Sequence, residues 1–209
     1  MVSAAALVLA AGGSTRLGTP KQLLEWEGRP LLERVVSAVA GWPVSEVVVV
    51  IGAEADAVLE AVEFPDAATV VLNEEWEEGM ASSLRAGLDV LTRGRGPEWA
   101  FVVLADQPHV PAEVPLRMLE AADLTHRLAV LPVYRYQRGN PALVSRALWP
   151  RLMSLEGDRG ASGLFDAHPE WVEEVRFDLA MPRDIDTPLD AEEVLPTRRP
   201  PFPGGGAGR

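Results

Sequence analysis

Short runs of apolar residues alternate with segments of helical periodicity along the first half of the chain. Unbroken apolar runs at 4–10 and 47–51 predict strands that are buried on both faces. The apolar positions of 31–39 instead recur at helical spacing and predict an amphipathic helix. Further strands are expected at 69–72 and 101–104, and further helices at 55–62 and 82–91. This alternation predicts right-handed crossovers, a mainly parallel sheet, and ligand contacts at the carboxyl ends of its strands.

The second half of the chain has a less regular pattern. It predicts helices at 111–122, 144–155 and 161–167, a strand at 128–136, and an edge or antiparallel strand at 172–177. A short final helix should begin near Pro188, with Asp186 or Thr187 close to its N-cap. We therefore expect one α/β domain over residues 1–196, a Rossmann-like three-layer sandwich. The Pro/Gly-rich segment 197–209 cannot build a core, and we expect it to be disordered.

Composition narrows the classes of function. A chain of 209 residues with 47% hydrophobic residues can bury a substantial core. Its net charge of −12 and the lack of a Lys/Arg stripe argue against a nucleic-acid partner. Without cysteine, the chain has no disulfide, thiolate nucleophile or Cys-based metal site. We see neither a basic signal-peptide region nor an apolar run of membrane-spanning length, so we expect a cytoplasmic protein without a membrane partner.

The first strand runs into a loop of small residues that contains two cations. The sequence from Leu7 to Lys21 reads LVLAAGGSTRLGTPK. A buried strand that enters a glycine-rich turn can direct backbone N–H groups at an anion, and Arg16 and Lys21 would supply countercharge to a polyphosphate. An ordinary strand–loop turn explains the same residues equally well. Two common phosphate loops are excluded, because Thr19 stands where a Walker A loop needs lysine and no G-x-G-x-x-G occurs.

Polar residues also follow the later strands. The segment 73–84 reads NEEWEEGMASSL, in which Ser82 and Ser83 could contact a nucleotide or only cap a helix, and its acidic run is typical of a solvated face. Asp106 directly follows a buried strand, where a carboxylate can cap a turn or hold Mg²⁺. Asp184 and Asp186 stand at i and i+2, on one side of an extended segment.

These motifs resemble those of the MobA-like nucleotidyltransferases over nearly the whole chain. The first loop resembles LA(A/G)GxSxRxG followed by lysine, 73–84 resembles N-x-x-W-x-x-G-M-x-x-S-L, and L-A-D-Q-P resembles the family's metal-binding segment. The stretch from Asp184 to Asp190 resembles the ending D-x-D-T-P-E-D-L, although Leu189 stands where many relatives have Glu. Within the family the molybdenum cofactor cytidylyltransferase branch is most similar, and the implied fold is of the nucleotide-diphospho-sugar transferase type.

The resemblance implies roles for individual residues. Arg16, Lys21 and Asp106 would be catalytic, and Asp106 and Asp186 would bind Mg²⁺, with Mn²⁺ as an alternative; Asp184 is a weaker candidate. Nucleotide contacts are expected from Leu9, Ala10, Ala11, Gly12, Gly13, Lys21, Gly79, Ser82, Ser83 and Ala105. Acceptor contacts are expected from Arg138, Gly139, Asn140, Pro141, Gly157, Asp158 and Gly160, although both of these segments could also be plain turns.

The implied reaction is transfer of CMP from CTP to the terminal phosphate of molybdopterin, with release of pyrophosphate. The methyl group of Ala11 occupies space that a purine would need, and relatives that use GTP tend to have glycine there. Asn140 replaces a histidine that is frequent in the cytidylyltransferase branch, which concerns the acceptor. A molybdoenzyme that receives the cofactor is a further partner that the resemblance allows. Two alternatives stay open: nucleotidyl transfer to a sugar or polyol phosphate, and a non-catalytic cofactor chaperone.

Overall fold

The computed structural model describes residues 2–93, 96–158 and 160–195. The Pro/Gly segment 197–209 lies outside those residues. The expected domain boundary after residue 196 therefore stays a prediction.

An eight-stranded sheet forms the centre of the molecule, and its main path has the order β10-β7-β9-β6-β1-β4-β5. All neighbours on that path are parallel except β9, which is antiparallel to both β6 and β7; the two-residue β8 pairs with β7. The strands are β1 (Ala4–Ala10), β4 (Val47–Ile51), β5 (Ala68–Leu72), β6 (Trp99–Leu104), β7 (Ala129–Tyr134), β8 (Gln137–Arg138), β9 (Ala142–Ser145) and β10 (Val172–Phe177).

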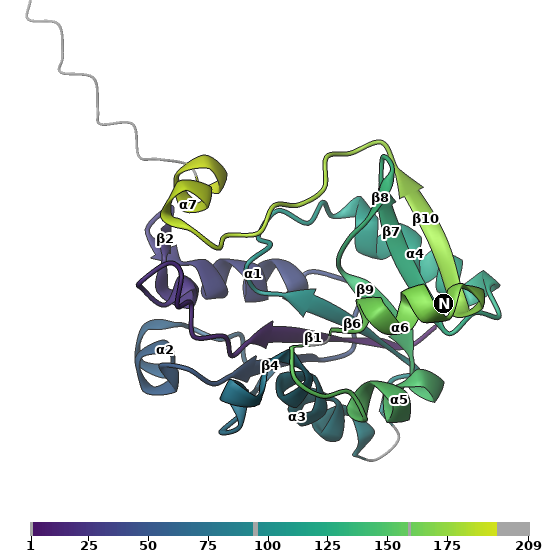
Figure 1. Ribbon diagram of the computed structural model, residues 1–209, viewed down its shortest axis with the longest axis horizontal. Helices are drawn as coiled ribbons and strands as arrows, with labels where there is room; N and C mark the ends of the chain where they lie inside the picture. Colours follow the sequence, from purple (N-terminus) through teal and green to yellow (C-terminus); the bar gives the residue numbers. More distant parts are fainter. Residues whose placement is uncertain (1, 94–95, 159, 196–209) are drawn as a thin grey trace, which may run out of the picture.

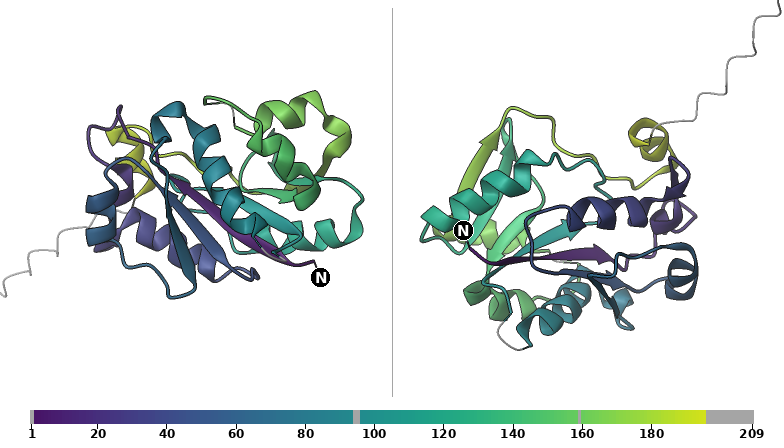
Figure 2. Two further views of the ribbon diagram at one scale, coloured as in Figure 1. Left: turned by 90° about the horizontal axis from the view of Figure 1, so that it is seen from below. Right: turned by 180° about the vertical axis from the view of Figure 1, so that it is seen from behind.

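Helices cover both faces of this sheet and make a three-layer sandwich (Figures 1 and 2). Apolar residues of α1, α2 and α4 join the core cluster on one face, and those of α3, α5 and α6 join the cluster on the other. Their bounds are α1 (Leu31–Ala40), α2 (Ala55–Ala61), α3 (Met80–Thr92), α4 (Glu113–Leu124), α5 (Trp149–Met153) and α6 (Ser162–Ala167).

The central strand β1 explains why its sequence is apolar without interruption. It lies between β4 and β6, so both of its edges are paired and both of its faces are covered. Ala6 and Val8 point into one core, whereas Leu7 and Leu9 point into the other. All seven residues of β1 and all five of β4 are buried. The expected fold class, a mainly parallel α/β sandwich with an antiparallel strand, is confirmed.

The prediction of a helix over 144–155 is wrong in its first part. Ala142–Ser145 forms β9, a 3₁₀ turn covers Arg146–Leu148, and the helix α5 begins only at Trp149. A run of four residues is too short to distinguish a strand from a helix by periodicity, and its insertion between β6 and β7 decides the outcome. The strand β10 lies at the edge, as expected, but it runs parallel to its neighbour.

A small hairpin and the last helix flank the loop after β1. The hairpin, β2 (Glu25–Trp26) and β3 (Arg29–Pro30), is too short to have left a periodic signal in the sequence. Helix α7 (Pro188–Val194) begins as predicted, with Pro188 at its start and Thr187 as N-cap in a capping box with Asp190. After β10 the chain returns across the molecule, so α7 lies near β2 (Figure 1). In the described part of the chain, no helix is long and apolar enough to cross a membrane.

The fold predicts different outcomes for alanine at two helical glycines. An added Cβ at buried Gly87 of α3 would lie 2.1 Å from Leu7 Cδ1, whereas one at exposed Gly163 of α6 would meet nothing within 4 Å. We expect Gly87→Ala to lower the free energy of unfolding by about 1–3 kcal/mol, because Leu7 is fixed in the central strand. Gly163→Ala should raise it by about 0.5–1 kcal/mol. Urea unfolding measures both; equal values for the two variants would contradict this packing.

Candidate active site

The short 3₁₀ turn at Lys21–Leu23 holds the loop after β1 in place. Gln22 is 2% exposed, and its Nε2 donates to the carbonyl oxygens of Ala10 at 2.7 Å and Gly12 at 2.9 Å. The hydroxyl of Ser14 accepts a hydrogen bond from the backbone N–H of Lys21 at 2.9 Å. The two ends of the loop are therefore tied together, and the side chain of Lys21 begins at a fixed point.

Lys21 joins two carboxylates from distant parts of the chain. Its ammonium lies 2.5 Å from Asp106 Oδ2 and 3.3 Å from Asp186 Oδ1, and the side chains of Lys21 and Asp106 are each 19% exposed. Asp106 stands just beyond β6, beside the end of β1. Asp186 arrives on the returning segment, where the N–H of Ile185 donates to the carbonyl oxygen of Asp106 at 3.1 Å. The fold thus brings together three of the residues singled out in the sequence.

Arg16 completes the cluster from the solvent side. Its Nη2 lies 3.3 Å from Asp186 Oδ2, and its side chain is 73% exposed. A small cavity of about 130 Å³ separates the loop at 12–17 from Ile185 and Asp186. Because an exposed guanidinium keeps its freedom to move, Arg16 can turn from Asp186 toward an incoming anion at little cost.

The electrostatics of the cluster keep Lys21 charged. Burial of the ammonium acts to lower the pKa of Lys21, but the carboxylates of Asp106 and then Asp186 outweigh it, so the pKa lies above its usual value. Asp184 does not reach Lys21; it accepts a hydrogen bond from Gln107 Nε2 at 2.6 Å. Partial burial raises the pKa of Asp184, against the hydrogen bond from Gln107, and the nearby carboxylates of Asp106 and Asp186 add to the rise.

The two carboxylates are suited to hold a divalent cation. Asp106 Oδ1 is buried and accepts no hydrogen bond, while Asp106 Oδ2 and Asp186 Oδ1 converge on a single positive charge. Carboxylate oxygens are the preferred ligands of Mg²⁺ and Mn²⁺. Among the described residues no group of three or more His, Cys, Asp or Glu gathers around one point. The remaining ligands of such an ion would therefore be phosphate oxygens and water.

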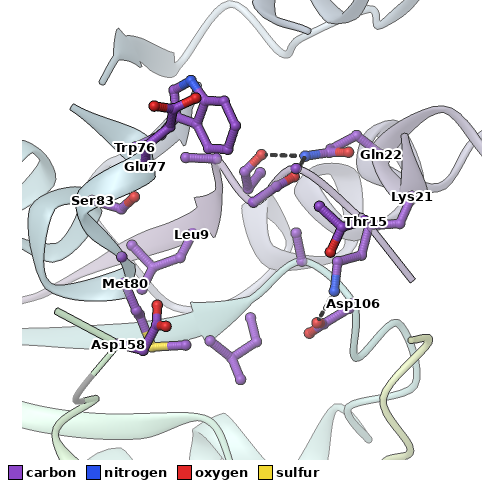
Figure 3. A pocket seen from close by; sticks show the side chains of 17 residues that line it. Leu9, Thr15, Lys21, Gln22, Trp76, Glu77, Met80, Ser83, Asp106 and Asp158 are labelled. Atoms are coloured by element: carbon purple, nitrogen blue, oxygen red, sulfur yellow. Dashed lines mark hydrogen bonds and ion pairs between the residues drawn. The ribbon is translucent and has the colours of Figure 1, made fainter. Parts of the chain in front are cut away.

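A cavity of about 420 Å³ opens beside this cluster, at the carboxyl ends of β1 and β6. Figure 3 shows Lys21 and Asp106 at one end, with Trp76, Glu77, Met80 and Asp158 toward the other. Ten of the residues expected at a nucleotide or catalytic site line it: Leu9, Ala10, Ala11, Gly12, Gly13, Lys21, Gly79, Ser83, Ala105 and Asp106.

Ser82, also expected at the nucleotide, lies behind this cavity instead. Its hydroxyl donates to the carbonyl oxygen of Gly79 at 2.8 Å, and Asn73 Nδ2 donates to Ser82 and Ser83 at 2.8 and 3.0 Å. Buried Asn73 therefore attaches the end of β5 to the first turn of α3, whose N-cap is Gly79 rather than a serine. A nucleotide contact by Ser82 remains a prediction.

Two glycines leave room for the side chain of Trp76, which lines the cavity. A Cβ added at Gly13 would lie 3.0 Å from Trp76 Cζ3, and one added at Gly52 would lie 2.6 Å from Trp76 Cβ. The tryptophan side chain can thus pack directly on the glycine-rich loop. The sequence motif 73–84 contains Asn73 and Trp76 without marking them as functional, and Gln22 directly follows the loop motif. The available signal was a large or amide side chain close to a glycine.

A second cavity of about 440 Å³ adjoins the first, and both are lined by Met80, Leu104 and Asp158. Of the expected acceptor residues, Arg138, Gly139, Asn140, Asp158 and Gly160 line it. The other two lie elsewhere: Pro141 is buried directly before β9, and the carbonyl oxygen of Gly157 accepts from the N–H of Ala81 at 3.0 Å. Arg138 is already paired with Glu174 and Asp166, at 2.7 and 3.3 Å.

Comparison with known proteins assigns the chain to a family. The MobA-like NTP transferase domain matches residues 6–172. The chain therefore belongs to the MobA-like NTP transferase family, as its motifs suggested, and it is a nucleotidyltransferase by family.

Individual relatives are similar over most of the chain. Nicotine blue oxidoreductase of Paenarthrobacter nicotinovorans is 31% identical over 193 residues, which are 87% of this chain and 91% of that protein. The crystal structure of Rv0371c from Mycobacterium tuberculosis H37Rv has a TM-score of 0.84 and 30% identity, covering 93% of this chain and 97% of that one. A structure of Rv0371c in complex with manganese has a TM-score of 0.79 and 27% identity, covering 92% and 98%.

Removal of the Lys21 ammonium should lower the stability of the folded protein. Lys21→Met leaves Asp106 and Asp186 without their shared partner. We expect the free energy of unfolding to fall by about 1–3 kcal/mol, because the loss of a half-buried ion pair should cost more than that of an exposed pair and less than that of a fully buried one. Because the pKa of Lys21 is raised from 10.5, the stabilisation is complete below that value and is lost only above it. The deficit should therefore be constant from about pH 6 to pH 9.

Divalent cations provide the second half of this test. In thermal unfolding, Mg²⁺ or Mn²⁺ should raise the Tm of Lys21→Met more than that of the unaltered protein, because the ion no longer competes with the ammonium. The surface variant Arg93→Met, which breaks an exposed pair with Asp89, is the control. An equal rise in all three proteins would contradict a cation site between Asp106 and Asp186.

Proposed function

We propose that this protein is a cytidylyltransferase that moves CMP from CTP to the terminal phosphate of a molybdopterin-type cofactor and releases pyrophosphate. The observation that carries the proposal is the cluster of Lys21 with Asp106 and Asp186, at the end of a cavity lined by the glycine-rich loop. A polyphosphate needs positive charge and backbone donors at one end of its pocket, and this cavity offers both. An adjoining second cavity leaves room for an acceptor beside the nucleotide.

In the proposed reaction an oxygen of the acceptor phosphate attacks the α-phosphorus of CTP. The bond to the leaving pyrophosphate breaks as the new diphosphate bond forms. Such a transfer needs positioning and charge stabilisation rather than covalent catalysis. Lys21 and Arg16 would stabilise the charge on the transferred and leaving phosphates, and the loop at 10–13 would donate backbone hydrogen bonds to the triphosphate.

Asp106 and Asp186 would bind Mg²⁺, with Mn²⁺ as an alternative; the orphaned oxygen of Asp106 and the converging carboxylates support this assignment. When bound, the ion would neutralise part of the charge on the phosphates. The neighbouring structure of Rv0371c with manganese is consistent with a divalent cation in this family. Lys21, displaced from between the carboxylates, would remain within reach of the phosphates.

The choice of CTP rests on Ala11, which is buried and lines the cavity beside Gly13 and Trp76. Trp76 packs closely on Gly13 and Gly52, which supports a tightly packed wall at this side of the cavity. The choice of a molybdopterin acceptor rests on the resemblance of the Arg138–Pro141 and 157–161 segments to the family's acceptor segments, six residues of which line the second cavity.

Three other functions are less well supported. Transfer to a sugar or polyol phosphate would use the same loop and carboxylates and differ only at the second cavity. A chaperone that only binds the cofactor has no need for both carboxylates beside Lys21. One relative is named an oxidoreductase, but the sequence has no cysteine and no G-x-G-x-x-G fingerprint.

The experiment that tests the proposal measures pyrophosphate release with each of the four NTPs and Mg²⁺, with and without molybdenum-loaded molybdopterin. We expect release with CTP only when the cofactor is present. Asp106→Asn should lower kcat by at least about a hundredfold, as for loss of other charged groups that stabilise a transition state. The exposed Asp89→Asn is the charge-matched control and should keep full activity. Tight cofactor binding without release from any NTP would favour a chaperone.

Base selection is tested by Ala11→Gly. Removal of one methyl group in a pocket changes discrimination by about 1–3 kcal/mol, so the ratio of kcat/KM for CTP to that for GTP should fall by about 10–200-fold. The ratio is its own control, because a general loss of fold lowers both values alike. Efficient use of GTP by the unaltered protein would contradict the role of Ala11.

A further inference from the structure

Gln22 is a buried polar residue for which the proposed reaction has no direct use. It is 2% exposed, and both of its contacts go to carbonyl oxygens of the glycine-rich loop, those of Ala10 and Gly12 (Figure 3). Its Oε1 is buried without a hydrogen-bond partner. An unpaired amide oxygen has a cost in stability, so a purely structural role would favour an apolar side chain of the same shape.

The bonds from Gln22 determine which way the loop presents its polar groups. In a planar trans peptide unit the C=O and the following N–H point in opposite directions. Holding the carbonyls of Ala10 and Gly12 on the side of Gln22 therefore turns the N–H groups of Ala11 and Gly13 to the opposite side. Among the described residues the N–H of Gly13 has no hydrogen-bond partner, whereas the peptide unit that carries the N–H of Gly12 is held by another bond, from the N–H of Ala53 to the carbonyl oxygen of Ala11 at 3.1 Å. Both glycines line the candidate nucleotide cavity.

An anion is repelled by carbonyl oxygens and attracted by N–H groups. A glycine-rich loop can rotate its peptide units easily, because glycine permits backbone conformations that other residues avoid. Without a restraint, this loop could turn its carbonyls toward the cavity, and binding a phosphate would then require it to reorganise. Donors that are already oriented bind developing or resident negative charge without that cost.

We infer that Gln22 is a positioning residue: its carboxamide clamps two carbonyls of the loop so that the backbone N–H groups of Ala11 and Gly13 face the triphosphate. The inference rests on the proposed nucleotide site but not on the identity of the base or of the acceptor. Gln22 borders the cavity, but the donor group of its carboxamide is committed to the two loop carbonyls, so it acts through the backbone. The bond from the N–H of Lys21 to Ser14 is independent of this clamp, so Lys21 stays anchored when the clamp is removed.

The first test separates phosphate binding from nucleoside binding. Gln22→Met keeps the length and burial of the side chain and removes both donors. We expect its affinity for CTP and for Mg²⁺-pyrophosphate to fall roughly 10- to 100-fold, because the loop must now be oriented at the expense of binding. Its affinity for cytidine, which has no phosphate, should not change. Met118→Ala in α4, a buried site on a helix that packs against β7 and β10, should lower the Tm but keep the affinity for pyrophosphate.

A second measurement uses the unaltered protein and does not depend on any variant folding. With ¹⁵N-labelled glycine, the amide proton of Gly13 should shift downfield when Mg²⁺-pyrophosphate is added, as a hydrogen bond to phosphate forms. A Gly13 amide proton that does not move would overturn the inference. Retention of the full pyrophosphate affinity in Gln22→Met would do so as well. If the unaltered protein binds neither CTP nor pyrophosphate, the proposed function fails first and the inference fails with it.

Discussion

The site depends on one electrostatic interaction, the ammonium of Lys21 between the carboxylates of Asp106 and Asp186. Each carboxylate alone is an ordinary acidic side chain at the end of a strand or before a helix. Brought together in a half-buried corner, they repel one another and require a positive charge. The lysine supplies that charge from within the chain, and its own pKa rises in response. The same two carboxylates that stabilise the lysine are the natural ligands of a divalent ion.

The sheet brings the partners of this interaction together at one edge. The strands β1 and β6 are neighbours, so the loop after one lies beside the acidic residue after the other. Their apolar sequences are needed because both strands are buried on both faces. The third partner arrives on a segment that crosses back from β10, where a backbone hydrogen bond between Ile185 and Asp106 fixes its position. A chain of net negative charge thereby gathers two cations, Lys21 and Arg16, beside the glycine-rich loop.

The glycine-rich loop combines a restrained backbone with one mobile side chain. Gly13 allows Trp76 to pack against the loop, which shapes the cavity wall. Gln22 and Ser14 restrain the loop, Gln22 through two hydrogen bonds to loop carbonyls and Ser14 through one from the N–H of Lys21. Arg16 is left exposed and can move. The loop thus combines close backbone approach, oriented donors and one mobile cation, which are the features that a polyphosphate requires.

The sequence by itself determined the strands β1 and β4, the amphipathic helix α1 and the capped start of α7, because burial and capping leave local patterns of residues. The resemblance of its motifs to those of the MobA-like family also indicated Lys21, Asp106 and Asp186, whereas the residues by themselves allowed ordinary turn and capping roles. Only the tertiary structure decided that β9 is a strand, because four apolar residues take the conformation that their neighbours β6 and β7 impose. The same holds for Gln22: its amide has a purpose only once the turn at Lys21–Leu23 folds back under the loop, and no pattern of spacing records a contact between a side chain and a distant backbone carbonyl.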